Sequence, residues 1–195
     1  MKFIGRFVIL ILIISCSNKE NTLEDYANYP VKFPKQKVSS PNGEFSIFIP
    51  KDWKWKTEKN TDNKVIFEFE AVSKPNKDGF IDVISILKTE SFADSDDLKA
   101  EFEYYKNNVE NYSSIDHKIV KLGNTEILNQ ESYFLHIKSN PREYGEIETI
   151  SFIIDSKNKG EFYSLTASAS RTTELKKNMA VLIQSLKTFD YEKNE

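Results

Sequence analysis

The two histidines are the side chains best suited to acid–base or metal chemistry in this chain of 195 residues. His136 lies in an alternating stretch, on the face opposite Tyr133, Leu135 and Ile137, and His117 begins another such stretch. A metal or catalytic site would need a third His, Asp or Glu that converges on them. The spacing supplies none, so we predict no catalytic group, no metal and no cofactor. The alternative is a small periplasmic enzyme, or a metal- or ligand-binding protein, that uses His117 and His136.

Residues 94–97, Asp-Ser-Asp-Asp, begin like a calcium-binding loop. The pattern then fails, because Lys99 holds the sixth position, where Gly belongs, and Tyr105 holds the twelfth, where Glu belongs. The start of a helix capped by Asp94 or Ser95 is the better interpretation. The chain also has no Gly-x-Ser-x-Gly nucleophile motif and no Gly-rich phosphate loop.

Two aromatic side chains are candidates for contact with a partner. Trp55 is flanked by Lys54 and Lys56, and tryptophan is enriched at binding hot spots. Tyr144 lies in the segment 140–145, which contains a proline and a glycine. The favoured alternatives are packing of Trp55 beneath the loop that follows it and, for the Tyr144 segment, a plain connection between strands.

The single cysteine, Cys16, ends a segment with the pattern of an export signal. Two basic residues precede an unbroken apolar run over residues 7–14. This run is too short to cross a bilayer, which takes roughly 20 apolar residues, and the small residues of an ordinary secretory cleavage site are missing. Residues 13–16, Ile-Ile-Ser-Cys, resemble the lipobox of bacterial lipoproteins but depart from its usual pattern at Ile13 and Ile14.

The lipobox resemblance implies that residues 1–15 are a signal peptide and that Cys16 is acylated, for example with palmitate. Each buried methylene of an acyl chain contributes about 0.8 kcal/mol, so two or three chains would anchor the protein durably. Ser17, where no Asp follows the cysteine, implies delivery to the outer membrane if the cell has one, by resemblance to the enterobacterial sorting rule. We therefore expect a lipid-anchored protein of the bacterial envelope.

Charge and cysteine content narrow the function further. The 27 basic and 30 acidic residues give a net charge of −3, and loss of Lys2 and Arg6 with the signal peptide lowers it by two, to −5. This mild acidity argues against a nucleic-acid-binding surface, which needs clustered positive charge. With Cys16 acylated, no thiol remains for a disulfide or a metal.

Residues 16–41 are polar, contain Pro30 and Pro34 and show no sustained periodicity, which predicts a flexible tether. Tyr26 and its aromatic neighbours interrupt this pattern, and we expect them to pack on the domain. The folded domain is expected over residues 42–190.

Within that domain, apolar residues that recur every three or four positions predict helices from Leu98 to Tyr112 and from Leu175 to Phe189. Thr172 is the expected cap of the second helix, and the small residues 166–170 should let it lie close to the sheet. Alternating apolar residues predict strands over 45–49, 65–69, 80–87, 117–122, 125–128, 133–137, 147–154 and 162–169.

The order of these elements predicts an α+β fold, in which helices pack on an antiparallel sheet as an α/β/α sandwich. The segment 80–87 is apolar on both faces, as is typical of a central strand. The last three strands are expected to form an antiparallel meander.

Residues 45–53, Phe-Ser-Ile-Phe-Ile-Pro-Lys-Asp-Trp, form a strand followed by Pro-x-x-Trp. With the element order, the closing strand 163–169 and a helix that ends at 185–187, the chain resembles the PsbP-like fold over roughly residues 43–190. That fold is named for an extrinsic subunit of photosystem II and includes bacterial lipoproteins and periplasmic DcrB-type proteins. The resemblance implies a binding or assembly module, not an enzyme, and carries over no functional residue, because Pro50 and Trp53 look structural.

These observations predict a lipid-anchored envelope protein that acts as a non-enzymatic binding or assembly module. Its expected partners are the membrane, through the N-terminal lipid, and a protein that the sequence does not identify. A chaperone for hydrophobic segments is a further alternative, which requires an exposed apolar groove on the sheet.

Overall fold

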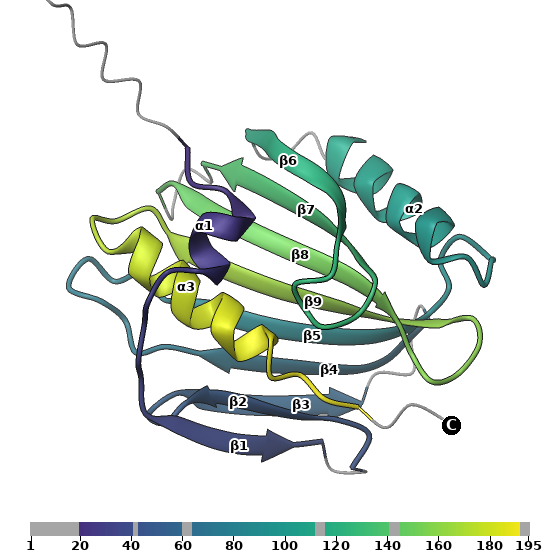
Figure 1. The fold of residues 1–195 in the computed structure, drawn as a ribbon, viewed down its shortest axis with the longest axis horizontal. Helices are drawn as coiled ribbons and strands as arrows, with labels where there is room; N and C mark the ends of the chain where they lie inside the picture. Colours follow the sequence, from purple (N-terminus) through teal and green to yellow (C-terminus); the bar gives the residue numbers. More distant parts are fainter. Residues whose placement is uncertain (1–19, 41–42, 60–63, 112–115, 141–144, 192–195) are drawn as a thin grey trace, which may run out of the picture.

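A seven-stranded antiparallel sheet forms the centre of the fold (Figure 1). The computed structural model describes residues 20–40, 43–59, 64–111, 116–140 and 145–191. The strand order is β3–β4–β5–β9–β8–β7–β6, and β1 pairs with β2 in a separate two-stranded sheet. The strands are β1 (Lys35–Ser39), β2 (Ser46–Pro50), β3 (Lys54–Lys59), β4 (Val65–Val72), β5 (Val83–Glu90), β6 (His117–Thr125), β7 (Ser132–Ser139), β8 (Ile147–Asp155) and β9 (Glu161–Ser170).

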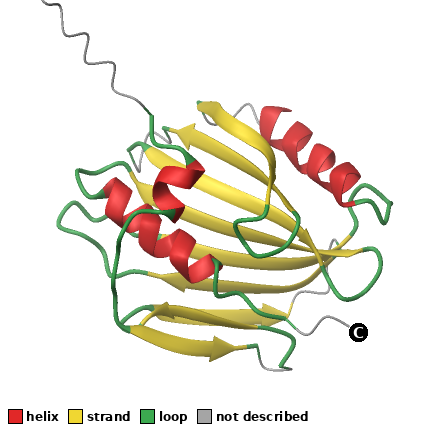
Figure 2. Ribbon diagram, in the orientation of Figure 1, coloured by secondary structure: helices red, strands yellow, loops and turns green. Residues whose placement is uncertain are grey.

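Helices lie on both faces of the large sheet (Figures 1 and 2). Helix α1 (Leu23–Ala27) and helix α3 (Leu175–Leu186) cover one face, and α3 packs on β9 and β2. Helix α2 (Leu98–Asn111) packs on the other face, over β7 and β8. The predicted α+β class is therefore confirmed, as are the central position of β5 and the antiparallel meander of β7, β8 and β9. Among the described residues, none of the helices has the length and apolar character needed to span a bilayer.

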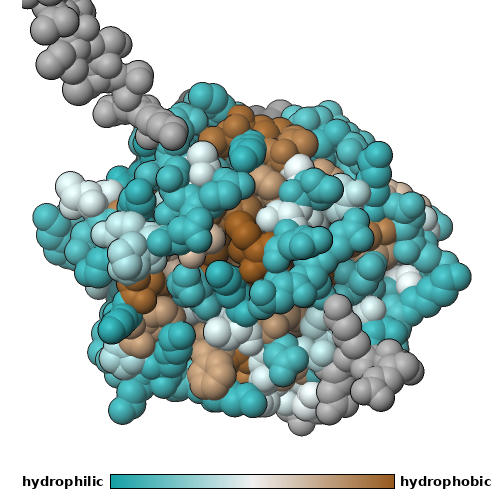
Figure 3. All heavy atoms as spheres, in the orientation of Figure 1, coloured by the Kyte–Doolittle hydropathy of each residue, from teal (hydrophilic) through white to brown (hydrophobic). Residues whose placement is uncertain are grey.

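The larger hydrophobic core lies between the sheet, α1 and α3. The buried face of α3 repeats at intervals of three and four residues, as the sequence predicts, through Met179, Leu182, Ile183 and Leu186. It packs over β9, where Ala167 and Ala169 are fully buried; their small side chains let the helix axis approach the sheet. The outer surface of this side is largely hydrophilic, with smaller hydrophobic patches (Figure 3).

A smaller core joins α2 to the opposite face of the sheet. Leu98 and Phe102 are buried there against three residues of β7, β8 and β9, namely Leu135, Ile153 and Phe162. Tyr105 and Val109 extend the same helical stripe and are partly buried. This confirms the predicted apolar stripe of α2 as far as Val109, and Tyr112 lies outside the described residues.

Residues 20–40, the described part of the segment 16–41, do not form the flexible tether that the sequence predicts. They belong to the domain: β1 pairs with β2, and α1 begins at a capping box formed by Thr22 and Asp25. Leu23 and Tyr26 of α1 are fully buried, which confirms the expected packing of Tyr26. A helix of five residues is too short to show a periodic apolar pattern, so its docking could not be predicted from periodicity.

Further strand features differ from the prediction, and the strand expected over 125–128 is wrong, because β6 ends at Thr125 and a turn follows. Strand β3 was not expected, because its sequence, Lys-Trp-Lys-Thr-Glu-Lys, is mostly charged; it is an edge strand, where charged side chains are common. Strand β6 runs without a break through Gly123 and Asn124, where a turn was expected. Both residues pair with β7, so long-range strand pairing overrides the local turn preference.

The close approach of α3 to β9 can be tested by overpacking. We expect Ala167→Leu to lower the free energy of unfolding by about 1–3 kcal/mol, because the added methylene and methyl groups have no space beneath α3. The matched control is Ser168→Leu, one residue along β9 on the opposite, half-buried face, which should lower it less. Urea denaturation measures both values; equal losses would contradict a tight contact between α3 and this strand.

Candidate functional site

The structure does not bring the two histidines together. In the antiparallel register of β6 and β7, His117 lies opposite Ser139, and residues directly opposite each other share a face of the sheet. His136 lies three residues before Ser139 on β7, and an odd spacing places it on the other face. No group of three or more His, Cys, Asp or Glu side chains that could hold a metal occurs among the described residues. A paired His117–His136 site, the alternative from sequence, is therefore wrong.

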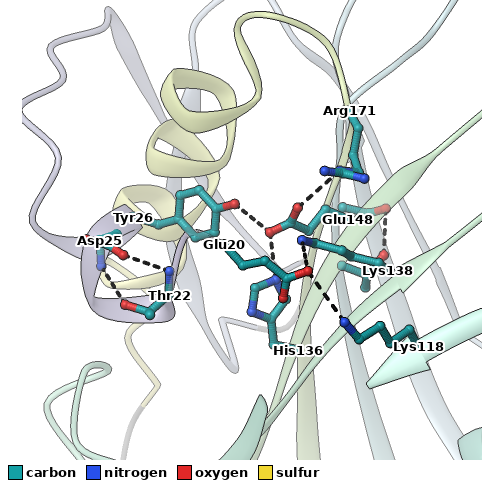
Figure 4. A network of polar contacts seen from close by, with 11 residues as sticks. Glu20, Thr22, Asp25, Tyr26, Lys118, His136, Lys138, Glu148 and Arg171 are labelled. Atoms are coloured by element: carbon teal, nitrogen blue, oxygen red, sulfur yellow. Dashed lines mark hydrogen bonds and ion pairs between the residues drawn. The ribbon is translucent and has the colours of Figure 1, made fainter. Parts of the chain in front are cut away.

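His136 instead belongs to a buried polar network with Glu148 and Tyr26 (Figure 4). Its Nε2 lies 2.7 Å from Oε1 of Glu148, and the hydroxyl of Tyr26 donates a hydrogen bond of 2.5 Å to the same oxygen. The three side chains come from β7, β8 and α1. Since an ionised carboxylate only accepts hydrogen bonds, Nε2 of His136 carries the proton in this contact.

Two opposing effects set the pKa of Glu148. Burial raises it, whereas the hydrogen bonds from His136 and Tyr26 lower it, and the net result is a pKa below its usual value. Burial, together with the neighbouring Glu148 carboxylate, raises the pKa of the Tyr26 hydroxyl, which therefore keeps its proton and acts as the donor. Nε of Arg171 adds a positive charge 3.7 Å from Oε2 of Glu148.

A more exposed ion-pair group continues this network toward the N-terminus. Oε1 of Glu20 lies 3.1 Å from Nζ of Lys138 and 3.6 Å from Nζ of Lys118 (Figure 4). The hydrogen bond to Lys138 and the charge of that lysine lower the pKa of Glu20. We call Glu20, Tyr26, His136, Lys138 and Glu148 together the N-terminal clamp, because they hold the segment that begins at Glu20 against β7 and β8.

The N-terminal clamp contains groups that elsewhere perform acid–base catalysis. Here Tyr26, His136 and Glu148 have at most 1% of their surface exposed, so a substrate has no access to them. Their geometry therefore stabilises the attachment of α1 to the sheet and does not form an active site.

The aspartates at residues 94–97 are used in structural contacts. Asp94 and Asp96 form ion pairs with Lys64 and Lys159, at 2.6 and 2.7 Å. Oδ1 of Asp97 accepts a hydrogen bond of 3.0 Å from the backbone N–H of Ala100. The start of a helix is thus confirmed in place of a calcium loop, but the side chain that caps it is Asp97, not Asp94 or Ser95.

The expected cap of α3 is also wrong. The helix begins after Glu174, which makes no side-chain capping bond, and the Thr172 hydroxyl accepts only a long hydrogen bond of 3.3 Å from the N–H of Glu174. Thr172 therefore shapes the turn that precedes the helix, and its carbonyl accepts from Leu175 at 3.1 Å.

Of the candidate contact residues, Trp55 can be placed. Its side chain stacks on Phe69, with ring centroids 6.2 Å apart, and is still 45% exposed at the edge strand β3. The exposed position keeps Trp55 as a candidate for partner contact. Tyr144 and Cys16 lie outside the described residues, so their proposed roles stay predictions.

An apolar cavity of about 250 Å³ lies between α2 and the sheet. It forms because α2 packs over β7 and β8, whereas part of the cavity floor belongs to β5 and β9. One wall is an aromatic pair, Phe92 and Tyr104, stacked with ring centroids 5.7 Å apart and nearly parallel planes. The lining is completed by Leu87, Thr89, Glu101, Tyr105, Asn108, Ile153, Phe162, Tyr163 and Ser164.

Sequence reasoning found neither Glu148 nor the cavity. The position of Glu148 could have been inferred from the sequence. It alternates along the strand with Ile150, Phe152 and Ile154, so it lies on the same buried face as these residues. A charged residue at such a position requires a buried partner. The cavity had no comparable signal, because it depends on where α2 crosses the sheet.

Comparison with known proteins supports the fold. No family model and no curated protein matches the chain. Among solved structures, the cyanobacterial PsbP (CyanoP) of Synechocystis sp. PCC 6803 is similar, with a TM-score of 0.57 at 13% identity, over 85% of this chain and 96% of CyanoP.

Two further solved structures agree with this result. The Ran-binding protein Mog1p of Saccharomyces cerevisiae gives a TM-score of 0.52 at 10% identity, over 82% of this chain and 96% of Mog1p. LpqN of Mycobacterium tuberculosis gives 0.51 at 11% identity, over 88% of this chain and 97% of LpqN. The chain therefore has a PsbP/Mog1-like α+β fold.

The hydrogen bond from Tyr26 to the buried carboxylate can be removed with little change in shape. We expect Tyr26→Phe to lower the free energy of unfolding by about 1.5–3 kcal/mol, the range for hydrogen bonds to charged groups. Tyr29→Phe, in the same segment but only half-buried, is the control and should change it by less than about 0.5 kcal/mol. Urea denaturation at pH 7 measures the free energy of unfolding of both variants. Similar small decreases in the two values would contradict the role given to Tyr26.

The charge of Glu148 should make stability depend on pH. Because its pKa is lowered in the folded state, its contribution is fully present above the ordinary value of 4.5 and is lost as the pH falls through the folded-state pKa. We expect Glu148→Gln to be less stable than the native chain at pH 7, by on the order of 1–3 kcal/mol, and to lose less further stability on acidification. Denaturation midpoints measured from pH 7 downward test this, with Glu146→Gln, at a more exposed glutamate, as the control; parallel curves for native and Glu148→Gln chains would contradict it.

Proposed function

We propose that this protein is a lipid-anchored, non-enzymatic binding or assembly module of the bacterial envelope, attached to the outer membrane through an acylated Cys16. The observation that carries the proposal is the N-terminal clamp, which holds Glu20 at the surface of the domain. Cys16 precedes Glu20 by four residues, and four extended residues span at most about 14 Å. An acylated Cys16 would therefore keep the domain beside the membrane.

The N-terminal clamp and the short link from Cys16 to Glu20 would together limit the orientations of the domain relative to the membrane. A domain on a long flexible tether samples many orientations, so its surfaces are presented to a partner only part of the time. A domain fixed close to its anchor has fewer orientations and would present the same surfaces to other membrane-bound components. This supports an assembly role next to the membrane.

The binding role also draws on the fold and on the surface. The similar structures include a Ran-binding protein and a protein involved in cell envelope biogenesis. In this chain, large exposed side chains that suit partner contact include Phe48, Trp55 and Tyr104. The two histidines lie on opposite faces, which removes the arrangement that favoured an enzyme.

The chaperone alternative fits less well. A chaperone for hydrophobic segments needs a groove that accommodates several apolar side chains in succession. The cavity beneath α2 has a volume of about 250 Å³, which suits one chain end and not an extended segment. A binding module therefore accounts better for the geometry.

The anchor is tested by fractionation of the full chain expressed in a bacterial host with lipoprotein processing. We expect the native chain in the membrane fraction and Cys16→Ser mostly in the aqueous fraction, because the acyl chains supply the membrane affinity. Ser17→Ala keeps the cysteine and should stay in the membrane fraction. Mass spectrometry should find an acylated N-terminal cysteine. An unacylated native chain, or a Cys16→Ser chain that still sediments with membranes, would contradict the proposed lipid anchor.

The assembly role needs a second measurement. Cross-linking on intact membranes, followed by recovery of the protein, should yield the same partner repeatedly, and Trp55→Ala should reduce the yield if this exposed ring is a contact. A matched substitution of another exposed residue on β3, Lys54→Ala, separates the ring from general charge effects. Repeated recovery of the protein alone would count against an assembly module.

A further inference from the structure

We propose that the cavity beneath α2 binds the end of one acyl chain, from an amphiphile whose headgroup carries no negative charge. The cavity walls are mainly apolar and aromatic, and they come from α2, the segment that precedes it and three strands. Apolar cavities of about 150 Å³ stay free of water and take up small hydrocarbons. This larger cavity has walls of the same apolar kind and opens to solvent at Tyr104 and Asn108.

The volume sets the length of chain that fits. A water molecule occupies about 30 Å³ in the liquid, and a methylene group has a similar volume, so 250 Å³ accommodates roughly eight methylene groups. An acyl chain is flexible and narrow enough to follow the space between α2 and the sheet. The stacked rings of Phe92 and Tyr104 form an apolar wall beside which such a chain can lie.

The charges of the lining select the headgroup. Among the described residues that line the cavity, Glu101 is the only one with a carboxylate. Its Oε2 already accepts hydrogen bonds from the Ser91 hydroxyl and the backbone N–H groups of Phe92 and Ala93, at 2.9, 2.9 and 3.1 Å. Nζ of Lys64, the cation near Phe92, is held by Asp94 at 2.6 Å. An anionic headgroup would therefore be repelled by the Glu101 carboxylate. Lys64 would not compensate for this, because its ammonium group is already paired with Asp94.

Polar groups on the exposed side of α2 suit a neutral headgroup. Tyr104 is 41% exposed and Asn108 is exposed, so both lie where the cavity meets solvent. Their hydroxyl and amide groups can exchange hydrogen bonds with a hydroxyl-bearing headgroup. The buried part of the ligand then needs no polar partner.

The position of the cavity indicates the source of the ligand, and this step rests on the proposed function. Glu20 contacts the end of the sheet where Lys138 lies, on the α1 side, whereas Ser164 lines the cavity on the α2 side. Lys138 on β7 pairs with Glu148 on β8, which in turn pairs with Ala169 on β9. Ser164 lies five residues from Ala169 along β9, a distance of roughly 17 Å. A domain anchored near Glu20 would present the cavity away from the bilayer, so the expected ligand is an amphiphile already released from a membrane.

Chain length provides a sharp test. The full chain carrying Cys16→Ser, which has no acyl group of its own to fill the cavity, is titrated calorimetrically with hexanol, octanol and decanol. Each added methylene should tighten binding about fourfold until the cavity is full, so octanol should bind roughly 15-fold more tightly than hexanol, and decanol should gain much less. Octanoate should bind more weakly than octanol. Absence of a chain-length dependence, or tighter binding of octanoate, would overturn the proposal.

Cavity filling locates the site. Ser164→Leu narrows the floor of the cavity and should weaken octanol binding at least tenfold. The control is Ser85→Leu on β5, which lies on the same face of the sheet as Ser164 but outside the cavity lining and should leave octanol binding unchanged. In the variant without these substitutions, octanol should shift the methyl resonances of Leu87 and Ile153, a readout that does not depend on how well Ser164→Leu folds. Equal binding by both leucine variants, unmoved methyl resonances, or benzyl alcohol bound as tightly as octanol would refute an acyl-chain site. Because this chain lacks Cys16, the result is independent of whether the protein is anchored.

Discussion

The buried carboxylate of Glu148 is the constraint on which the arrangement of the N-terminal segment depends. An ionised carboxylate in a protein interior costs several kcal/mol unless hydrogen bonds and opposite charges compensate for lost hydration. Here the compensation comes from His136 on the adjacent strand and from Tyr26 on a helix of five residues. The helix is too short to be stable alone. Its position is fixed because its tyrosine satisfies a group that the sheet has already buried, and Lys88, 3% exposed between Glu44 and Glu161, shows the same requirement elsewhere.

The two faces of the sheet are covered in different ways. On one face, α1 and α3 cover a large core, and the N-terminal clamp holds Glu20 beside Lys138. On the other face, α2 covers β7 and β8 and leaves a cavity at its margin. The N-terminal clamp and the cavity therefore lie on opposite faces of the sheet, so a ligand in the cavity would not contact the clamp.

Periodicity in the sequence predicted most of the domain, and the failures have physical causes. The long alternating segments around Phe67, Ile150 and Leu165, and the helical stripe of α2, appear where expected, because each buries one continuous face. The features that were missed depend on distant contacts: α1 docks through Tyr26, β3 is a charged edge strand, and Gly123 is held in β6 by pairing with β7. The same limit applies to the site. Alternation placed His136 on the correct face, but only the three-dimensional structure shows that its partner is Glu148 and that His117 faces the other way.

The cavity is difficult to explain as a packing fault. The cavity opens to solvent at Tyr104 and Asn108, so its apolar walls stay in contact with water, which forgoes about 25 cal/mol for each Å² of apolar surface left unburied. Replacement of Ser164 by a larger apolar residue would remove much of this cost without disturbing the main core, which lies on the opposite face. The N-terminal clamp shows that the same fold provides hydrogen bonds for the buried carboxylate of Glu148, which is costlier to bury than apolar surface. A cavity left open beside a well-packed core, with exposed polar residues at its rim, is therefore better explained by an occupant that enters and leaves than by incomplete packing.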